Sequence, residues 1–401
     1  MGKIGGFFRS YLKKQPLFAN KKSLQSTYTP GEISHRDDQI NYIANVLAPA
    51  LRLEKPSNLF LYGKTGSGKT LVMHYIVSQM LEVANEKNLP LKIVYLNCKL
   101  KRVADTEYRL IVQLAKEFNK EIPATGLPTD EVYKIFLSHL DQEKKLIILI
   151  LDEIDQLVKK AGDEFLYNLT RINTELKNVE ISLVGISNDL MFLDNIDPRV
   201  KSSLSEEELV FPPYNALQIQ DILKQRSKVA FADGVVTEGV IEKCAAYAAR
   251  EHGDARRALE LLRVAGELAE RKNKQLIGTE DIDEAEDRIE KDKVYDVICS
   301  QPKQSQVALL SIFEITETVT NQSIFTGDVY EVYKDLCIKI KLKPLTQRRV
   351  SDIIAELDML GIINARVISK GRYGRTRTIT LAIPLSSLSE IKTVLKESLN
   401  L

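Results

Sequence analysis

The stretch Asn-Leu-Phe-Leu-Tyr-Gly-Lys-Thr-Gly-Ser-Gly-Lys-Thr at residues 58–70 decides the fold. Its first five residues have the length and apolar character of a buried strand, and residues 71–83 repeat apolar side chains at helical spacing. Between strand and helix lies the pattern G-x-x-x-x-G-K-[ST], whose backbone N–H groups surround a phosphate at a helix N-terminus. Lys69 is expected to reach the β- and γ-phosphates and the Thr70 hydroxyl to ligate Mg²⁺. The residues predicted to bind a nucleoside triphosphate here are Gly63, Lys64, Thr65, Gly66, Ser67, Gly68, Lys69 and Thr70.

Two acids follow a second apolar strand. Residues 146–151 are all Leu or Ile, and Asp152 and Glu153 come directly after them. Because parallel strands of an α/β sheet end at the edge that carries the phosphate loop, both carboxylates are expected at that edge. Asp152 is predicted to hold Mg²⁺ and Glu153 to act as general base, whereas Asp155 is interpreted as the first-turn acid of a following helix. The two motifs together predict hydrolysis of ATP or GTP.

The patterning of the whole chain predicts an α/β core followed by a helical region and a third domain. Strands and helices alternate up to residue 186, which is the order of a parallel sheet covered by helices. Phe211-Pro212-Pro213 interrupts this order, and only helices are expected from there to about residue 292. Helices and two strand-like runs follow, which favours a winged helix-turn-helix. The predicted domains are a basic flexible arm (1–27), a nucleotide-binding core (28–211), a helical lid (212–293) and a winged-helix DNA-binding domain (294–401).

These domains contain the following expected elements. The core strands are expected at residues 58–62, 91–97, 146–151 and 180–186, and the core helices from residue 39 and at 71–83, 105–118, 129–140 and 162–176. The lid helices are expected at 216–230, 237–251, 254–272 and 279–291. In the third domain we expect a helix near residue 295, helices at 327–341 and 346–360, and strands at 363–369 and 376–383.

The composition limits the class of protein. The chain has 401 residues with 56 basic and 55 acidic side chains, a net charge of +1, so any basic surface has to be local. No apolar run approaches the roughly 18 to 20 residues that span a bilayer, and no secretory signal is recognisable, so a cytoplasmic protein without a membrane partner is expected. The four cysteines have no Cys-x-x-Cys spacing and are interpreted as buried thiols. Residues 1–31 contain six basic and no acidic side chains, which suggests a solvated arm.

The order of motifs resembles that of the AAA+ ATPases. The phosphate loop and Asp152-Glu153 are followed by Ile186-Ser187-Asn188 at a strand end, by Asp197-Pro198-Arg199, and by Gly253-Asp254-Ala255-Arg256 in the helical region. With the winged helix added, residues 24–390 are similar to archaeal replication initiators of the origin-recognition-complex and cell-division-cycle-six type.

That resemblance implies further site residues. Asn188 matches sensor 1, which orients the attacking water, and Arg256 matches sensor 2, a lid arginine at the γ-phosphate, with Arg257 as the alternative. Arg199 matches an arginine that reaches the nucleotide of a neighbouring subunit, but pairing with residues 206–208 of its own chain is equally compatible with the sequence. The resemblance also implies nucleotide contacts by Tyr28, Pro30, His35, Arg36, Tyr214 and Arg226.

The third domain holds a local excess of basic residues. Nine basic and three acidic side chains lie between Lys341 and Arg377, a local net charge of +6. Duplex DNA is the expected partner, read by a recognition helix from residue 346 and by a wing at 370–375; a hairpin that contacts proteins is the alternative. The residues predicted to touch DNA are Thr346, Gln347, Arg348, Arg349, Lys370, Arg372, Tyr373 and Arg375.

The resemblance implies a function for the whole chain. It implies a slow ATPase that uses ATP/ADP and Mg²⁺ as an assembly switch, binds origin duplex DNA at the nucleoid, and helps to load the replicative helicase, with other initiator subunits as further partners. It also implies a DNA-contacting element within residues 99–130, where Lys99, Lys101 and Arg102 are candidates. An AAA+ winged-helix transcription regulator, a mobile-element ATPase and a protein-remodelling ATPase are the competing hypotheses.

Overall fold

The computed structural model describes residues 16–99, 106–123, 125–204, 206–318, 324–369, 375–383 and 388–401. The chain forms two compact units that divide between Ile282 and Asp283. This division falls inside α12 (Thr279–Ser300), which continues past its predicted end at residue 291 and past the predicted domain boundary after residue 293. Within the described ranges, no helix is both long enough and apolar enough to cross a membrane.

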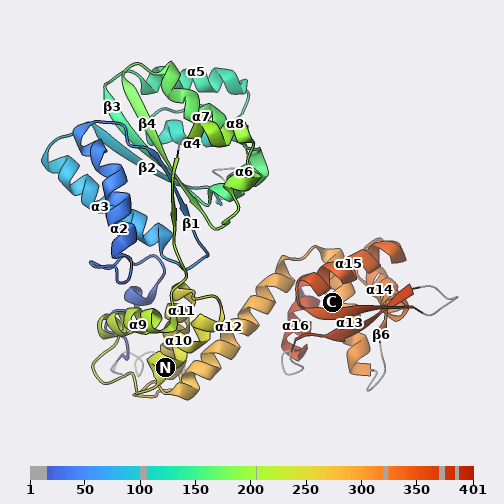
Figure 1. The fold of residues 1–401 in the computed structure, drawn as a ribbon. Coiled ribbons are helices and arrows are strands. Elements are labelled where there is room, and N and C mark those ends of the chain that lie inside the picture. The colour runs from blue at the N-terminus through green and yellow to red at the C-terminus, as the bar shows by residue number, and fades with distance from the viewer. Residues whose placement is uncertain are drawn as a thin grey trace, which may run out of the picture. The chain divides into compact units, whose positions relative to one another are not determined.

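A five-stranded parallel sheet forms the centre of the first unit, in the order β2-β3-β4-β1-β5 (Figure 1). The strands are β1 (Asn58–Tyr62), β2 (Leu91–Asn97), β3 (Lys145–Asp152), β4 (Val179–Ser187) and β5 (Glu206–Val210). At the end of β1, Tyr62 pairs with Ser187 on one side and with Val210 on the other. The ends of β1, β3 and β4 therefore bring the phosphate loop, Asp152 and Ser187 to one edge of the sheet.

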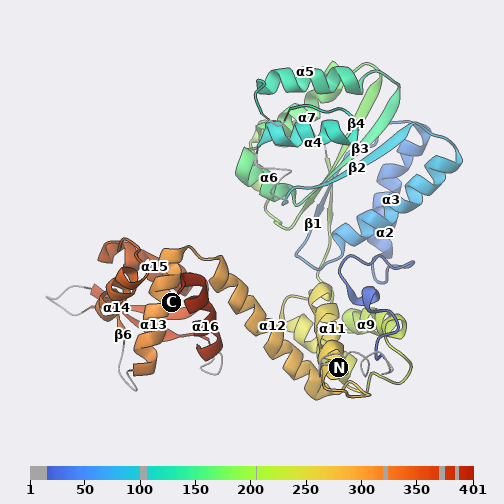
Figure 2. The same cartoon turned by 180° about the vertical axis from the view of Figure 1, so that it is seen from behind.

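Helices cover both faces of this sheet, because its strands direct alternate side chains into two apolar cores. Phe60 and Leu149 pack with α4, α5, α6, α7 and α8, whereas Leu59 and Ile148 pack with α2 and α3. Figures 1 and 2 show α2 and α3 on one face and α4, α5 and α7 on the other. The core helices are α2 (Asp37–Leu47), α3 (Lys69–Glu86), α4 (Glu107–Glu117), α5 (Thr129–Leu140), α6 (Ile154–Ala161), α7 (Glu164–Glu175) and α8 (Pro198–Leu204), with the 3-10 helices η2 (Ala48–Arg52) and η3 (Leu193–Asn195).

The lid consists of helices whose starts are explained by local sequence. It contains α9 (Ala216–Ala230), α10 (Val240–Arg250), α11 (Ala255–Arg271) and the beginning of α12. Asn215 and Gln218 form a capping box at the start of α9. Asp254 caps α11 by accepting hydrogen bonds from the N–H groups of Arg256 and Arg257. The cap fixes where α11 begins and therefore where Arg256 lies.

Residues 16–34, which we call the N-terminal strap, pack along the lid before the chain enters the core. The Ala19 N–H donates to the carbonyl of Ala230 at 2.8 Å, and the Phe18 ring lies 4.7 Å from the Phe231 ring. The strap contains η1 (Lys21–Leu24). Its buried side chains include Leu17, Phe18, Ser23, Leu24 and Ile33. The prediction of a flexible arm is therefore wrong for residues 16–27, because their apolar side chains and backbone donors find partners on the lid; residues 1–15 lie outside the described part of the chain.

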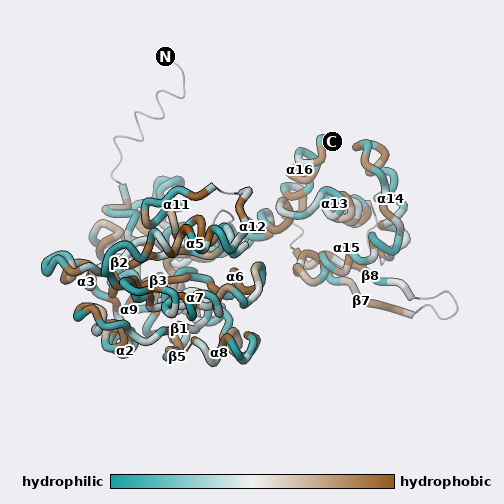
Figure 3. The backbone as a smooth tube through the Cα atoms, turned by 90° about the horizontal axis from the view of Figure 1, so that it is seen from above, coloured by the Kyte–Doolittle hydropathy of each residue, from teal (hydrophilic) through white to brown (hydrophobic). Residues whose placement is uncertain are grey.

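The second unit has the predicted winged-helix architecture. Its helices after α12 are α13 (Lys303–Thr318), α14 (Thr326–Lys339), α15 (Gln347–Met359) and α16 (Leu388–Leu399), and its antiparallel sheet has the order β6-β8-β7, with β6 (Ile324–Phe325), β8 (Arg375–Leu381) and β7 (Ile363–Ser369). Phe313, Tyr333 and Ile354 are fully or nearly fully buried in its core. Hydrophobic and hydrophilic stretches alternate along α13, α15 and α16 in Figure 3, as one-sided packing requires.

Candidate functional site

Lys69 opens α3 as a buried cation. The residue is 5% exposed, and its ammonium donates to the carbonyls of Gly63 (2.6 Å) and Lys64 (3.0 Å) and to Oδ1 of Asn188 (2.9 Å). Burial lowers the pKa of Lys69 to about 8, and the Asp152 carboxylate opposes this shift. The phosphate loop therefore carries a positive charge in a low-dielectric position where an anionic ligand would interact with it strongly.

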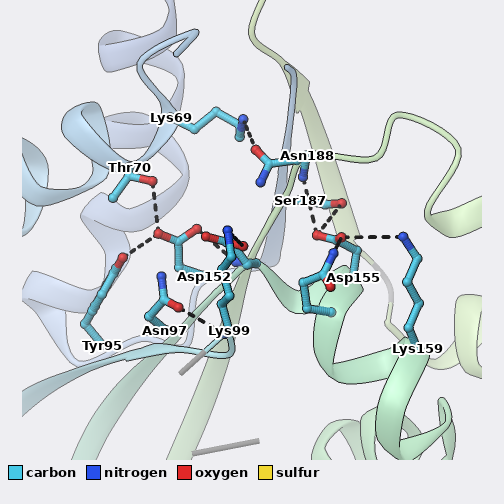
Figure 4. A network of polar contacts seen from close by, with 12 residues as sticks. Lys69, Thr70, Tyr95, Asn97, Lys99, Asp152, Asp155, Lys159, Ser187 and Asn188 are labelled. Atoms are coloured by element: carbon cyan, nitrogen blue, oxygen red, sulfur yellow. Dashed lines mark hydrogen bonds and ion pairs between the residues drawn. The ribbon is translucent and has the colours of Figure 1, made fainter. Parts of the chain in front are cut away.

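Asp152, at the end of β3, accepts hydrogen bonds from three donors. Thr70 Oγ1 donates to Oδ2 at 2.9 Å, the Tyr95 hydroxyl donates to the same oxygen, and the Glu153 N–H donates to Oδ1 at 2.9 Å (Figure 4). Burial and then this hydrogen bond raise the pKa of Tyr95 well above its ordinary value, so its phenol stays a donor. Thr70 and Asp152, the predicted metal-binding pair, are thus in direct contact.

Asp155 orients the segment that carries Asn188. Its side chain is 3% exposed, and Oδ1 accepts from Ser187 Oγ at 3.3 Å and from the Asn188 N–H at 3.5 Å. On the other side, Lys159 Nζ lies 3.8 Å from Oδ2 (Figure 4). Asp155 lies in the first turn of α6 as predicted, and it also holds Ser187 and Asn188 beside Lys69.

Glu153 lies between the metal-binding pair and α6. Its backbone has φ 55°, in the left-handed region, and its Oε2 lies 3.6 Å from Lys99 Nζ. Lys99, one of the candidate DNA contacts from the sequence, lines the same cavity as Glu153. The other two candidates for that contact, Lys101 and Arg102, lie outside the described residues.

A cavity of about 730 Å³ lies between the core, the lid and the N-terminal strap. The predicted site residues that line it are Tyr28, Pro30, Thr65, Gly66, Gly68, Lys69, Thr70, Asp152, Glu153, Asn188, Tyr214, Arg226 and Arg256. Residues 25–34 of the strap form one wall, and Ile222, Val229 and Leu259 of the lid supply apolar surface. The motifs that are distant in sequence therefore converge on one cavity.

Other predicted residues lie outside this lining. His35 Nε2 lies 3.2 Å from Oδ2 of Asp221 on α9, and the Arg36 guanidinium donates to backbone carbonyls. Arg199 also lies outside the cavity, with an 87% exposed side chain whose Nε is 3.5 Å from Oδ1 of Asp197.

The structure distinguishes the two arginines that could serve as the lid arginine. Arg256 is exposed toward the cavity that it lines, whereas Arg257 is buried with its Nε 3.3 Å from Oε2 of Glu251. The geometry therefore favours Arg256 over Arg257.

Sequence reasoning missed Tyr95 and a contact between lid and phosphate loop, and it indicated only Tyr28 and Pro30 of the strap wall. A Cβ placed on Gly66 would lie 1.8 Å from Oδ1 of Asp254, so the lid carboxylate touches the loop. The register of β2 against β3 pairs Asn97 with Asp152, which brings Tyr95 close to the acid. A polar residue near the C-terminal end of a neighbouring strand was the available signal for Tyr95.

These residues fit a nucleotide with a divalent metal ion. Gly66 and Gly68 of the phosphate loop line the cavity with φ of 73° and 96°, the left-handed backbone that lets successive N–H groups surround an anion. Thr70 and Asp152 offer the oxygen ligands that Mg²⁺ prefers, and Lys69 offers a cation to phosphate oxygens. The cavity volume lies in the usual range for ligand sites.

The start of α15 exposes the predicted recognition residues. Thr346, Gln347, Arg348 and Arg349 are all exposed, while Val350, Ile353, Ile354 and Leu357 face the core. The Thr346 hydroxyl accepts from the Arg349 N–H at 3.4 Å, which caps the helix. Because the buried face fixes the helix, the polar first turn is held toward solvent in a defined orientation.

The wing of this domain is described only in part. The predicted contacts Lys370, Arg372 and Tyr373 lie outside the described residues, and Arg375 begins β8. Arg377, another basic residue of this segment, donates from NH1 to the carbonyl of Ser351 at 2.9 Å and so ties β8 to α15.

The fold and the site define an AAA+-type ATPase with a helical lid and a winged-helix domain. Family models described as "AAA domain", "Cdc6 AAA+ ATPase-type lid domain" and "CDC6, C terminal winged helix domain" match residues 52–191, 220–287 and 296–390. The chain belongs to the archaeal ORC1-type DNA replication proteins, as the comparisons with individual members show.

Those comparisons cover nearly the whole chain. It is 50% identical over 389 residues to ORC1-type DNA replication protein 1 of Methanosarcina mazei, covering 97% of this chain and 93% of that protein. It is 50% identical over 385 residues to the ORC1-type DNA replication protein of Pyrococcus furiosus, covering 95% and 91%. The solved structure of the Aeropyrum pernix ORC1 protein in complex with DNA superimposes with a TM-score of 0.83 at 43% identity, covering 96% of this chain and 98% of that one.

Proposed function

We propose that this chain is an ATP-dependent initiator of DNA replication that binds duplex DNA at origins and helps to recruit or load the replicative helicase. The observation that carries the proposal is the single cavity where Lys69, Thr70, Asp152 and Asn188 of the core meet Arg256 of the lid. Membership of the ORC1-type family supports the assignment to replication.

The proposed ligand is ATP with Mg²⁺. Lys69 would bind the β- and γ-phosphate oxygens, and Thr70 and Asp152 would hold the metal ion, the aspartate through water. When bound, Mg²⁺ would neutralise charge on the phosphates. The Tyr95 hydroxyl keeps the Asp152 carboxylate in one orientation through its hydrogen bond.

Hydrolysis is assigned to the residues around Glu153. Glu153 would accept the proton of the attacking water, Asn188 would orient that water, and Arg256 would contact the γ-phosphate. In the structure Lys99 Nζ lies 3.6 Å from Oε2 of Glu153, so this ion pair involves one of the two carboxylate oxygens. The exposed Arg199 would act on the nucleotide of a neighbouring initiator subunit.

The slow reaction would serve as an assembly switch. A triphosphate bound by Lys69 of the core and Arg256 of the lid favours the arrangement in which core and lid are held together, and the diphosphate product lacks one of these contacts. The nucleotide state would then control assembly with the helicase and with other initiator subunits. A protein with this role acts at chromosomal DNA, so we propose a cytoplasmic, nucleoid-associated location.

ATP binding and hydrolysis are tested with two variants. Lys69→Ala should bind no ATP in equilibrium dialysis at concentrations that saturate the wild type, while Lys87→Ala, at the other end of α3, should bind normally. Glu153→Gln should bind ATP and fail to hydrolyse it. Retained affinity in Lys69→Ala refutes the phosphate-site assignment, and unchanged turnover in Glu153→Gln removes this residue as the base.

DNA recognition is tested by selecting duplexes from random and genomic pools in the presence of ATP. We expect a recovered sequence that clusters at origins, and a salt slope that is lower by about 1 in Arg375→Ala than in wild type. Arg288→Ala on α12 removes the same charge from a helix rich in acids and should leave the slope unchanged. Salt-sensitive binding without sequence preference would refute origin recognition by this chain.

Helicase recruitment is tested on the selected duplex. Wild type and Glu153→Gln should retain the replicative helicase in the presence of ATP, whereas Lys69→Ala should not, because its nucleotide site is empty. Equal retention by all three proteins would refute nucleotide-controlled recruitment.

A further inference from the structure

Arg36 is a buried cation that joins three segments of the first unit. The residue is 2% exposed, and its guanidinium donates to the carbonyls of Ser67 (3.0 Å), His35 (3.3 Å) and Pro212 (2.6 Å). Ser67 belongs to the phosphate loop, and Pro212 belongs to the connection between core and lid. Burial lowers the pKa of Arg36, but an arginine stays charged at neutral pH. One side chain therefore fastens the phosphate loop to the start of the lid.

Tyr214 completes this arrangement. The Arg36 guanidinium lies over its ring at 3.8 Å from the centroid, a geometry that stabilises a desolvated cation. A Cβ placed on Gly68 would lie 2.7 Å from the Tyr214 hydroxyl, and a Cβ on Gly253 would lie 2.2 Å from the Tyr214 carbonyl oxygen. Tyr214 thus touches both the phosphate loop and the lid turn three residues before Arg256.

The guanidinium of Arg36 is engaged by the backbone and lies outside the cavity lining. Its Nε, NH1 and NH2 atoms each donate to a backbone carbonyl, and Arg36 does not line the cavity. The structure shows no carboxylate paired with it among the described residues. A buried charge without an acid is costly unless its donors are bound, and here carbonyls from three segments accept from three of the five guanidinium N–H donors while the Tyr214 ring covers its face. Arg36 therefore holds backbone segments together.

We propose that Arg36 and Tyr214 are positioning residues that set the lid arginine Arg256 against the phosphate loop, and that Arg36 does not itself bind the nucleotide. The inference rests on the proposed function, since it needs ATP in the cavity. It replaces the direct nucleotide contact that the sequence suggested for Arg36. A lysine could not do the same work, because the three carbonyls are bound by three different nitrogens of the planar guanidinium, which also stacks on the Tyr214 ring, and a lysine side chain has one nitrogen and no such plane.

A double-mutant cycle between Arg36→Lys and Arg256→Ala tests the proposal. The readouts are kcat and the ratio of the dissociation constants for ADP and ATP. Each single change should lower kcat by roughly tenfold or more and reduce the preference for ATP. If Arg36 acts by placing Arg256, the double variant should match Arg256→Ala within about twofold, because the second change has nothing left to remove.

Matched variants separate positioning from a general loss of stability. Arg171→Lys removes a similar stack on α7, where the guanidinium lies 4.5 Å from the Tyr167 ring outside the cavity, and it should leave kcat and the ADP/ATP ratio unchanged. If Arg36→Lys fails to fold, Tyr214→Leu removes the ring under the guanidinium and should show the same non-additivity with Arg256→Ala.

Three outcomes have defined meanings. Effects that multiply in the double variant would overturn the inference, because Arg36 would then contact the nucleotide independently. A lower melting temperature with an unchanged ADP/ATP ratio would overturn it as well, because the role would be structural only. Absence of ATP binding in the wild type would refute the proposed function itself and is visible before any variant is made.

Discussion

Replacing Asp352 by Asn should strengthen DNA binding in a salt-dependent way. In α15 the Arg349 NH1 lies 3.7 Å from Oδ2 of Asp352, and their side chains are 58% and 54% exposed. Asp352 therefore forms an ion pair with an arginine in the first turn of the predicted recognition helix. It also places a negative charge near the expected phosphates. An exposed pair of this kind contributes only about 0 to 1 kcal/mol to stability, so the helix should tolerate the change.

The magnitude follows from counterion release. One additional phosphate contact steepens the dependence of log affinity on log salt by about 0.9. Between 50 and 200 mM salt, a fourfold change, the gain of Asp352→Asn over wild type should therefore shrink by about 3.5-fold. We expect the variant to bind several times more tightly at the lower salt and to approach wild type at the higher one.

Fluorescence anisotropy with one fixed duplex over this salt range measures both quantities. Glu356→Gln is the matched control, since it makes the same charge change one turn further along α15 on an exposed residue. Its slope should stay closer to that of wild type. A slope in Asp352→Asn equal to wild type, or an equal gain in Glu356→Gln, would show that the freed Arg349 makes no phosphate contact and that the first turn of α15 is not the DNA-reading surface.

Two further predictions concern the first unit and the thiols. Gly66→Ala should destabilise the first unit by more than the roughly 1 kcal/mol that a left-handed alanine costs, because its Cβ would lie 1.8 Å from Oδ1 of Asp254. Gly234→Ala is the control, since Gly234 has a similar φ and no atom near its Cβ position. The melting temperature of Gly66→Ala should fall further than that of Gly234→Ala. Cys299 is exposed, so the interpretation of buried thiols is wrong for this residue and holds for Cys98, Cys244 and Cys337. A maleimide at pH 8 should label Cys299 and spare Cys98, because burial raises the pKa of Cys98 to about 12. Mass spectrometry of the native protein measures the labelling, and rapid labelling of Cys98 would show that the core opens.

The sequence predicted most elements of the first unit, and the exceptions have physical causes. β5 was missed because it begins with Glu206, Glu207 and Glu208, residues of low strand propensity that are tolerated on an edge strand paired only with β1. For α6 the sequence indicated only the first-turn acid Asp155 and no bounds, because this helix is short and directly follows the acids of β3. The sheet order β2-β3-β4-β1-β5 also cannot be derived from alternation along the chain, which predicts that the strands are parallel but not which are neighbours.

The candidate site was predictable where residues follow strand ends. Lys69 and Asn188 follow β1 and β4, and Asp152 is the last residue of β3. Parallel strands bring their C-terminal ends together, so these residues share one cavity. The sequence did not predict the contacts of Tyr95 and Arg36, because both residues contact tertiary neighbours that no periodic pattern reveals. The sequence suggested a nucleotide contact for Arg36, whereas the structure directs its donors to backbone carbonyls.

The N-terminal strap explains why one ligand can influence both core and lid. Its first part is fastened to α9 through Ala19 and Phe18, its second part lines the cavity at residues 25–34, and its end leads into α2 of the core. A ligand in the cavity therefore touches core, lid and the segment that joins them. At a hundred times its dissociation constant, such a ligand stabilises the folded state by about 2.7 kcal/mol. This gain should raise the unfolding temperature of the first unit and leave that of the second unit unchanged, because all residues that line the cavity belong to the first unit.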